Sequence, residues 1–294
     1  MQTKTEIQEL LTLAQVKPNK RLGQHFLIDL NLLRLLVESA DIQSNDVVLE
    51  VGCGTGSLTS ALAEKAGQVI AVEYDRTLAA IAKEQLAQFN NIDLINADIL
   101  DTKHTFNHIV VDTLSLARKS KTGRFLLIAN LPYNVASPVM ANLVTGPLIA
   151  DAMYVTIQKE VAERMAARPG SKDYGTLSVF LGATGDVKMN RVLKPSVFWP
   201  MPKVNSAMVT FTRNPVQCRR IADMDLFCQT VHLFMSHQRK TIQGCGKLAD
   251  KSADERLAQA DWPAIFERCG LDATKRPQQL SPEEYIALAK EVVR

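Results

Sequence analysis

The chain has 294 residues, a length that predicts about two domains at roughly 150 residues each. Hydrophobic residues make up 46% and charged residues 22%, which excludes a largely disordered or fibrous protein. No apolar run approaches the roughly 18 residues that a membrane helix needs, and the N-terminus does not resemble a signal peptide. Five cysteines without a CxxC spacing argue against a disulfide framework and a zinc site. We therefore expect a cytoplasmic protein without a metal or a membrane partner.

The net charge of +3 is spread unevenly along the chain. Residues 159–220 carry eleven basic and four acidic residues, or +7, whereas residues 27–158 carry nine and fourteen, or −5. A basic block beside an acidic one predicts a surface for a polyanion, because nucleic-acid affinity comes mainly from phosphate neutralisation. A solvated face with ordinary charge scatter has the same composition and stays an alternative.

Short β-branched runs alternate with amphipathic segments through the first two thirds of the chain. Helical spacing of apolar residues predicts helices over residues 30–40, 58–66 and 78–86. The alternation predicts an α/β protein with a parallel, doubly wound, Rossmann-like sheet. Strands are expected at residues 47–51, 69–73, 92–95, 125–129 and 153–157, with further strands near residues 187–193 and 207–211.

The pattern of hydrophobic residues changes after Asn214-Pro215, and no further run typical of a strand follows. Two helical stripes follow instead, one over Phe227, Val231, Phe234 and Met235, the other over Ile286, Leu288, Ala289 and Val292. We therefore predict a first domain over residues 1–214 and a small all-helical C-terminal domain over residues 215–294. The stretch Thr102–Gly123 is polar and without a clear pattern, and we expect it to be a surface excursion.

A glycine loop, Gly52-Cys53-Gly54-Thr55-Gly56, follows the first buried strand and precedes a helix. Glycines there let the backbone approach a ligand without a Cβ in the way. The spacing is GxGxG, whereas the dinucleotide fingerprint is GxGxxG. With Glu50 the loop reads ExGxGxG, the pattern of S-adenosylmethionine methyltransferases. The loop alone is also compatible with a left-handed turn that binds nothing.

Two acidic residues follow the next two strands. Glu73 can accept hydrogen bonds from both hydroxyls of a ribose, and Asp98 can accept one from the amino group of adenine. Each acid alone is equally typical of a helix cap or a turn. Because doubly wound sheets bind ligands at the carboxyl ends of their strands, the acids and the loop together predict an S-adenosylmethionine site.

The tetrapeptide Asn130-Leu131-Pro132-Tyr133 ends the fourth predicted strand. The Asn130 side chain can accept one N–H of an adenine amine, which points the amine's lone pair at a methyl donor. Pro132 stiffens the turn, and Tyr133 offers a ring on which an extruded base can stack. Phe198, held extended by the prolines that follow it, is expected to face Tyr133 across that base. The alternatives are a simple Asn-x-Pro turn and an aromatic residue packed under a proline-rich loop.

With these residues in place, the chain resembles the ribosomal RNA adenine dimethyltransferase family, most closely its bacterial small-subunit members. The resemblance spans the chain and includes the helical tail. Its motifs are Lys20-Arg21-Leu22-Gly23-Gln24-His25-Phe26-Leu27, Glu50–Gly56, Glu73, Asp98, Asn130–Tyr133, Phe198–Ser206 and Gln238-Arg239-Lys240-Thr241.

The resemblance implies that S-adenosylmethionine is the cofactor, S-adenosylhomocysteine the product, and that no metal takes part. It implies dimethylation of N6 of two adjacent adenosines near the 3′ end of 16S ribosomal RNA. The expected partner is that RNA in the immature 30S subunit, with a role in ribosome biogenesis, a helical domain that contacts the RNA, and a monomeric enzyme.

Carried over by position, the resemblance assigns roles to single residues. His25, where the family usually has asparagine, and Leu27 lie toward the methionine end of the cofactor, and Gly52 lies in its loop. Glu73 is implied at the ribose, Asp98 at the adenine, and Asn130 between the cofactor and the target base.

Two other readings remain open. One is the large-subunit branch of the same family, which confers macrolide resistance. Three features argue against it: the amino-acid sequence of the tetrapeptide, the Gln24–Leu27 segment and the long helical tail. The other is an assembly or transcription factor that keeps the fold without catalysis. All the residues that the chemistry needs are present, apart from the family's usual asparagine at the position of His25. This argues against that reading.

Overall fold

The computed structural model describes residues 1–19 and 22–293, so Lys20 and Arg21 of the first family motif lie outside the described residues. The chain forms two compact units. One comprises Met1–Ala162 and Lys188–Thr212, and the other comprises Glu163–Val187 and the residues from Arg213 onward. Among the described residues, no helix has the length and apolar character needed to cross a membrane.

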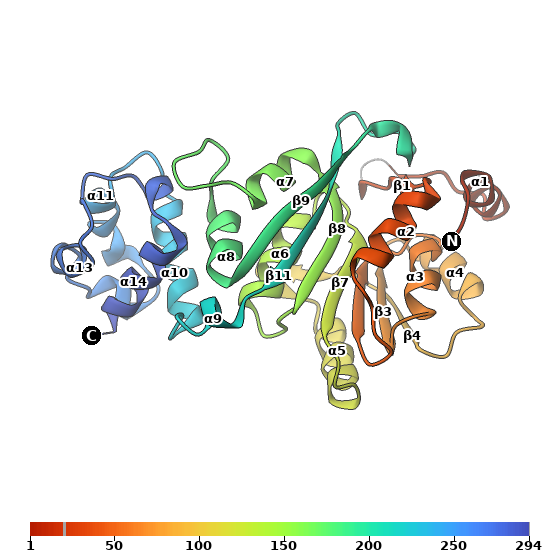
Figure 1. Ribbon diagram of the computed structural model, residues 1–294, viewed down its shortest axis with the longest axis horizontal. Coiled ribbons are helices and arrows are strands. Elements are labelled where there is room, and N and C mark those ends of the chain that lie inside the picture. Colours follow the sequence, from red (N-terminus) through yellow and green to blue (C-terminus); the bar gives the residue numbers. More distant parts are fainter. Residues whose placement is uncertain (20–21, 294) are drawn as a thin grey trace. The chain divides into compact units, whose positions relative to one another are not determined.

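A seven-stranded sheet in the order β4-β3-β2-β7-β8-β11-β9 forms the centre of the first unit (Figure 1). The strands from β4 to β8 are parallel, and β11 runs antiparallel to β8. The predicted α/β sheet and all seven predicted strands are confirmed. Their bounds are β2 Val47–Val51, β3 Gln68–Glu73, β4 Ile92–Asn96, β7 Phe125–Asn130, β8 Ala152–Gln158, β9 Gly185–Leu193 and β11 Ser206–Arg213.

The order of the strands determines where a ligand can bind. From β2 the chain winds outward through β3 to β4, and it then returns to the other side of β2 to form β7 and β8. The winding therefore reverses between β2 and β7. In open α/β sheets this reversal leaves a crevice at the carboxyl ends of the strands, and ligands bind there. The glycine loop follows β2 and the tetrapeptide begins at the end of β7, so both lie at this crevice.

The predicted helices are confirmed as α2 (Leu30–Ser39), α3 (Ser57–Ala63) and α4 (Arg76–Gln85). Apolar side chains of α2 and α3 pack in one cluster with side chains from β2, β3, β7 and β8. The α4 helix extends this layer over Ala71 of β3. Asp29 caps α2, because its carboxylate accepts from the backbone N–H groups of Asn31 and Leu32.

The stretch Thr102–Gly123 is mostly exposed, as expected of a surface excursion, but the expected lack of a regular pattern was wrong. Residues 108–120 form a 13-residue helix, α5 (His108–Ser120), which Asn107 caps. Its buried face consists of Val110, Leu114 and Ala117, one side chain per turn, and this face packs near β3 and β4. Three buried side chains form too narrow a stripe to stand out in a segment that is otherwise mostly exposed. A short hairpin, β5 (Leu100–Thr102) and β6 (Thr105–Phe106), precedes the helix.

Further short elements complete the first unit. The helix α1 (Lys4–Leu13) packs Ile7 and Leu11 against Leu78 and Ile81 of α4. The strand β1 (Phe26–Leu27) pairs antiparallel with β10 (Phe198–Trp199), and α6 (Ala136–Thr145) follows the tetrapeptide. The helix α7 (Lys159–Met165) begins in the first unit and ends in the second.

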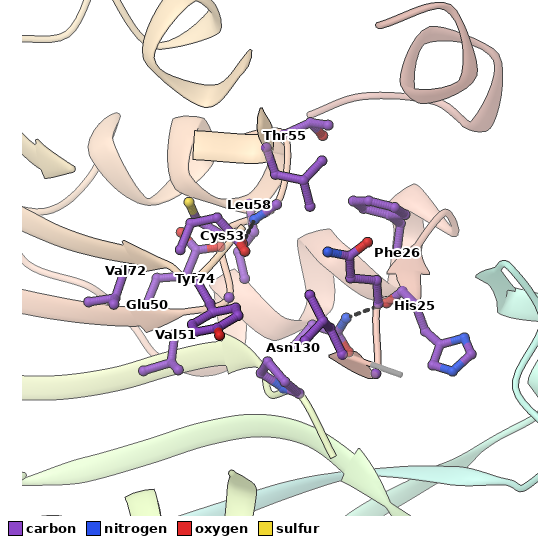
Figure 2. Close-up of a pocket in the computed structure, with 18 of the residues that line it drawn as sticks. His25, Phe26, Glu50, Val51, Cys53, Thr55, Leu58, Val72, Tyr74 and Asn130 are labelled. Atoms are coloured by element: carbon purple, nitrogen blue, oxygen red, sulfur yellow. Dashed lines mark hydrogen bonds between the residues drawn. The ribbon is translucent and has the colours of Figure 1, made fainter. Parts of the chain in front are cut away.

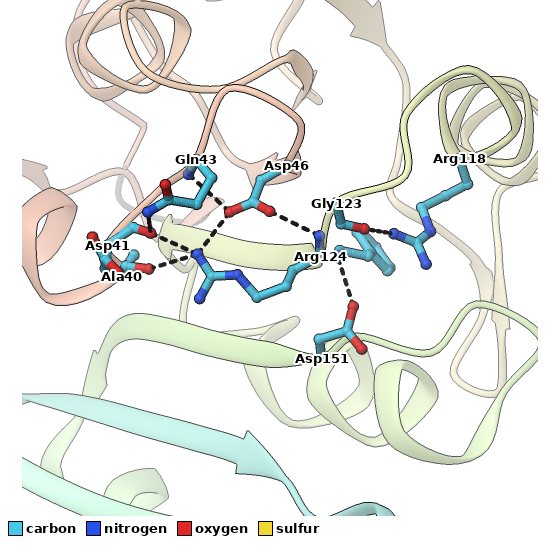
Figure 3. Close-up of polar contacts among 9 residues, drawn as sticks. Ala40, Asp41, Gln43, Asp46, Arg118, Gly123, Arg124 and Asp151 are labelled. Atoms are coloured by element: carbon cyan, nitrogen blue, oxygen red, sulfur yellow. Dashed lines mark hydrogen bonds and ion pairs between the residues drawn. The ribbon is translucent and has the colours of Figure 1, made fainter.

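The ends of β2 and β7 opposite the crevice are joined by an ion pair between the buried carboxylate of Asp46 and the partly exposed guanidinium of Arg124 (Figure 3). Asp46, just before β2, accepts from the backbone N–H of Arg124 at 2.8 Å and from its guanidinium at 2.7 Å. Burial alone would raise the pKa of Asp46, but hydrogen bonds from Arg124 and Gln43 lower the pKa below its ordinary value. The two central strands are thus fixed relative to each other at this edge.

The second unit is helical and surrounds a cluster of aromatic side chains. Phe234 makes edge contacts with Trp262, Phe266 and Tyr285, with ring centroids 5.1–6.4 Å apart. The helix α8 (Thr176–Thr184), which the sequence groups with the first domain, lies in this unit and packs Phe180 on Phe227. The remaining helices are α9 (Pro215–Cys218), α10 (Met224–Met235), α11 (Ile242–Gly246), α12 (Glu255–Ala258), α13 (Trp262–Arg268) and α14 (Pro282–Val292).

Candidate active site

A cavity of about 270 Å³ lies in the first unit at the carboxyl ends of β2, β3, β4 and β7 (Figure 2). It is therefore next to the point where the winding of the sheet reverses. Seven of the nine residues predicted for the site line this cavity: His25, Leu27, Gly52, Glu73, Asp98, Asn130 and Pro132. The structure thus brings together residues that are up to 107 positions apart in the sequence (132 − 25).

The glycine loop has the backbone conformation that its sequence predicts. Gly52 and Gly54 have φ angles of +78° and +59°, in the left-handed region that side chains rarely adopt. A Cβ at Gly52 would lie 2.8 Å from Cγ of Pro132, and one at Gly54 would lie 2.9 Å from the ring of Phe26. Glycine at these two positions therefore lets the loop touch the tetrapeptide and the strand β1.

Glu73 ties this loop to the helix that follows β3. Its Oε2 accepts from the backbone N–H of Gly54 at 2.8 Å, and its Oε1 accepts from that of Asp75 at 2.9 Å. Burial raises the pKa of Glu73, while the two backbone donors oppose that shift. Each carboxylate oxygen can accept a second hydrogen bond, so the contacts to the loop leave acceptor capacity toward the cavity.

Glu50 is a site residue to which the sequence analysis gave no role beyond the ExGxGxG pattern. Its carboxyl group is buried in the cavity wall, and Oε2 has no hydrogen-bond partner among the described residues. Burial raises the pKa of Glu50 to about 8; the Thr59 hydroxyl opposes this shift, and the charge of Glu73 adds to it. A buried acceptor without a partner is costly unless a ligand satisfies it.

The far end of the cavity combines a carboxylate with an exposed ring. Asp98 is exposed, and its Oδ1 accepts from the backbone N–H of Leu100 at 3.0 Å, so it also holds its own turn. Tyr74, next to Glu73, lines the same cavity and is 60% exposed. Sequence reasoning missed Tyr74 and also Ile7 of α1, which contributes to the lining without any motif.

The side-chain amide of Asn130 is held from both sides. Its Nδ2 donates to the backbone carbonyl of His25 at 2.7 Å, the contact drawn in Figure 2. Its Oδ1 accepts from the hydroxyl of Thr156 at 2.5 Å. A carbonyl oxygen can only accept, so the first contact fixes which end of the amide is the oxygen.

His25 meets Asn130 through its main chain, so this contact does not depend on the imidazole side chain. Figure 2 shows the imidazole ring on the other side of the backbone from Asn130. The ring stacks on Tyr133 with centroids 5.5 Å apart, and Nδ1 lies 2.6 Å from the carbonyl oxygen of Pro200. Because that oxygen only accepts, Nδ1 carries the proton.

Tyr133 and Phe198, the two predicted stacking residues, are not among the described residues that line the cavity. Tyr133 is half-buried, and its hydroxyl lies 2.8 Å from that of Ser206. Phe198 is only 3% exposed and packs in the same apolar cluster as the side chains of α2 and α3. Its partner across the β1–β10 pair is Leu27, which belongs to that cluster too. Instead of Phe198, the ring of His25 lies against Tyr133.

The chemistry of the cavity suits a ligand that has a nucleoside at one end and a positive charge at the other. Acceptors surround it at Glu50, Glu73 and Asp98, and the glycine loop allows close approach of a ligand to the backbone. The unpartnered carboxyl oxygen of Glu50 fits a cationic group in particular. These features fit S-adenosylmethionine, whose ammonium and sulfonium are positively charged.

Comparison with known proteins identifies the family. The family described as "Ribosomal RNA adenine dimethylase" matches residues 15–267. The chain is 36% identical to "Ribosomal RNA small subunit methyltransferase A" of Clostridium acetobutylicum over 276 residues, 94% of each chain. It is 37% identical to the protein of that name from Alkaliphilus metalliredigens over 274 residues, 93% of this chain and 91% of the relative.

Solved structures agree on the fold. A dimethyladenosine transferase from Plasmodium falciparum has a TM-score of 0.67 at 22% identity and covers 88% of this chain and 94% of its own. The 23S rRNA methyltransferase ErmE has a TM-score of 0.58 at 24% identity, covering 92% and 100%. This methyltransferase fold implies the use of S-adenosylmethionine. With the family match over most of its length, the chain belongs to the ribosomal RNA adenine dimethylase family.

Proposed function

We propose that the protein transfers methyl groups from S-adenosylmethionine to adenine N6 in 16S ribosomal RNA, producing dimethyladenosine at two adjacent positions near the 3′ end. The observation that carries the proposal is the fixed amide of Asn130 in the cavity wall, whose oxygen is oriented by contacts on both sides. The small-subunit relatives, which match over more than nine-tenths of both chains, support this choice of RNA.

The cofactor, when bound, supplies an activated methyl group, so the protein contributes binding and orientation. We assign its methionine end to His25, Leu27 and Gly52, its ribose to Glu73, and its adenine to Asp98. Glu50 would face the cofactor's ammonium, since a nearby cation favours the ionised carboxylate. The scheme needs no metal, because the electrophile arrives with the cofactor and leaves S-adenosylhomocysteine behind.

The exocyclic amine of adenine is a poor nucleophile, because its lone pair is delocalised into the ring. Oδ1 of Asn130 would accept one N–H of this amine and draw the nitrogen toward tetrahedral geometry. The bound cofactor would supply the methyl group, so that a new N–C bond replaces its S–C bond, and the amine proton, acidic after methylation, would pass to water. Pro132 would hold the turn, and we keep Tyr133 and Phe198 as the proposed stacking residues for the extruded base.

We place the RNA along the basic block, residues 159–220, and along the helical residues 215–294. Lys188 and Arg191 on the edge strand β9, and Lys194 just after it, are exposed and available to phosphates. We propose that the monomeric enzyme meets its RNA in the immature 30S subunit, in the cytoplasm, as a step of ribosome biogenesis.

The test is methyl transfer to small subunits that lack these modifications. The protein and methyl-labelled S-adenosylmethionine are incubated with unmethylated small subunits, with large subunits in parallel, and the modified nucleotides are mapped by mass spectrometry. We expect dimethyladenosine at two adjacent positions near the 3′ end of the small-subunit RNA. Label only in large subunits, or at another nucleotide, would contradict the proposal.

Asn130→Ala is the matched inactive variant. It should bind S-adenosylmethionine within a few-fold of wild type and retain less than about a tenth of the transfer rate, because a positioned contact to the reacting group typically contributes on the order of 2–4 kcal/mol. Retention of a higher rate would remove Asn130 from the target amine.

A further inference from the structure

Thr156 contacts the reactive asparagine from a position that no motif identifies. Its hydroxyl donates to Oδ1 of Asn130 at 2.5 Å, while Nδ2 of the same amide donates to the carbonyl of His25. An amide oxygen has two acceptor positions. The Thr156 hydroxyl occupies one of them, so one acceptor position of this oxygen is left for another donor.

The backbone around Thr156 is rigid. Thr156 lies on β8, where it pairs with Asn130 of β7 on one side and with Met208 of β11 on the other. Its carbonyl also accepts from the N–H of Leu131 at 3.0 Å, so the same residue holds the start of the tetrapeptide loop. A β-branched side chain in the middle of a sheet has little rotational freedom. The hydroxyl therefore approaches Asn130 from a fixed direction.

The side chain of Thr156 is also fully buried. Water therefore does not compete for its hydroxyl, and a hydrogen bond in such an environment is stronger than one at the surface. With the carbonyl of His25 at the nitrogen end and Thr156 at the oxygen end, rotation of the amide would break both hydrogen bonds. Functional groups supported in this way on strands hold their geometry better than groups on loops.

We propose that Thr156 is a positioning residue for methyl transfer. By donating to Oδ1 of Asn130, it directs the remaining acceptor position of that oxygen toward the cavity, where the adenine amine would donate. The inference rests on the proposed function, since it assigns Thr156 to the reaction proposed for Asn130. Thr156 acts only through Asn130 and is given no contact to the cofactor.

The test compares side chains that differ in the hydroxyl. Thr156→Val keeps the volume and branching but removes the hydroxyl, and Thr156→Ser keeps the hydroxyl but removes the methyl group. We expect Thr156→Val to lower kcat on unmethylated small subunits by about 10- to 100-fold, because small misplacements of a reacting group have effects of this size. The KM for subunits and the Kd for S-adenosylmethionine should stay within about threefold. Thr156→Ser should restore kcat to within about threefold of wild type.

Thr145→Val is the matched control, because the Thr145 hydroxyl also donates within the first unit, to the backbone carbonyl of Ala141 in α6 at 2.9 Å, and Thr145 does not line the cavity. It should lose thermal stability as Thr156→Val does but keep its kcat. If Thr156→Val does not fold, Thr156→Ala against Thr156→Ser compares the same hydroxyl in two smaller side chains.

Equal kcat for the variants with and without the hydroxyl, or a fall in cofactor affinity that matches the fall in kcat, would overturn the positioning role. Failure of the wild-type protein to methylate small subunits would instead overturn the proposed function. The two failures are therefore distinguished within one set of assays.

Discussion

Glu50→Gln should stabilise the cofactor-free protein at pH 8 and at the same time weaken cofactor binding. The pKa of Glu50 is raised from its ordinary value of 4.5 to about 8, mainly by burial. Below pH 4.5 the folded and unfolded chains both hold the proton. Between pH 4.5 and 8 only the unfolded chain releases it, so the free energy of unfolding falls as the pH rises. Glutamine has nearly the same shape and no such titration.

The size of the effect follows from the two pKa values. Their difference of 3.5 units (8 − 4.5) corresponds to about 5 kcal/mol at 1.36 kcal/mol per unit, reached above pH 8. At pH 5 the same difference amounts to less than about 1 kcal/mol. Denaturant unfolding of wild type and Glu50→Gln at both pH values measures it. The exposed Glu84 on α4 supplies the control Glu84→Gln, which should change stability little at either pH.

The same variant tests the proposed place of the cofactor's ammonium. Calorimetry at pH 8 should show at least tenfold weaker binding of S-adenosylmethionine to Glu50→Gln, because a neutral amide cannot pair with a cation. Equal stability changes at pH 5 and pH 8 would refute the raised pKa. Unchanged affinity for the cofactor would place its charged end elsewhere in the cavity.

Two further predictions concern the base and the RNA. If Phe198 stacks on the base, Phe198→Leu should slow both methyl transfers without arresting the product at monomethyladenosine. Normal transfer rates by nucleoside mass spectrometry, with only the lower thermal stability expected of a core change, would assign Phe198 to the core alone. Reversing the charges of Lys188, Arg191 and Lys194 together should weaken the salt dependence of binding to small subunits. The slope of log binding constant against log salt concentration should become shallower by roughly 0.7–0.9 for each phosphate that the variant no longer neutralises. An unchanged slope in a salt titration would leave these side chains as a solvated face.

The centre of the sheet was predictable from the sequence because its central strands are buried on both faces. Val47–Val51 and Phe125–Asn130 are almost continuous apolar runs, and such runs between glycine and polar segments are typical of central parallel strands. The α5 helix escaped prediction because it buries only Val110, Leu114 and Ala117, while its other apolar residues, such as Ile109 and Leu116, are exposed and blur the helical stripe. The α8 helix is apolar, but no local pattern indicates that its partners, α10 and α14, begin 40 or more residues after its end.

The candidate site, like the fold, has residues that the sequence predicts and residues that it does not. The sequence identified the residues that come at the carboxyl ends of strands, where an apolar run gives way to glycine or polar residues. These are the glycine loop, Glu73, Asp98 and Asn130. The support of Asn130 was not identifiable, since one partner is a main-chain carbonyl at His25 and the other is Thr156, a threonine typical of any strand interior. The burial of Phe198 depends on the pairing of β1 with β10, which joins segments far apart in the sequence.

The second unit is assembled from two separate stretches of chain, and this limits how far the protein is modular. A fragment ending near residue 214 would retain every strand of the large sheet, yet it would expose Leu177, Phe180 and Leu181 of α8, which are buried in the intact chain. A fragment starting at residue 215 would lack the helix on which Phe227 packs. Transplanting the helical unit to another methyltransferase therefore requires three junctions, after residues 162, 187 and 212, and not a single cut.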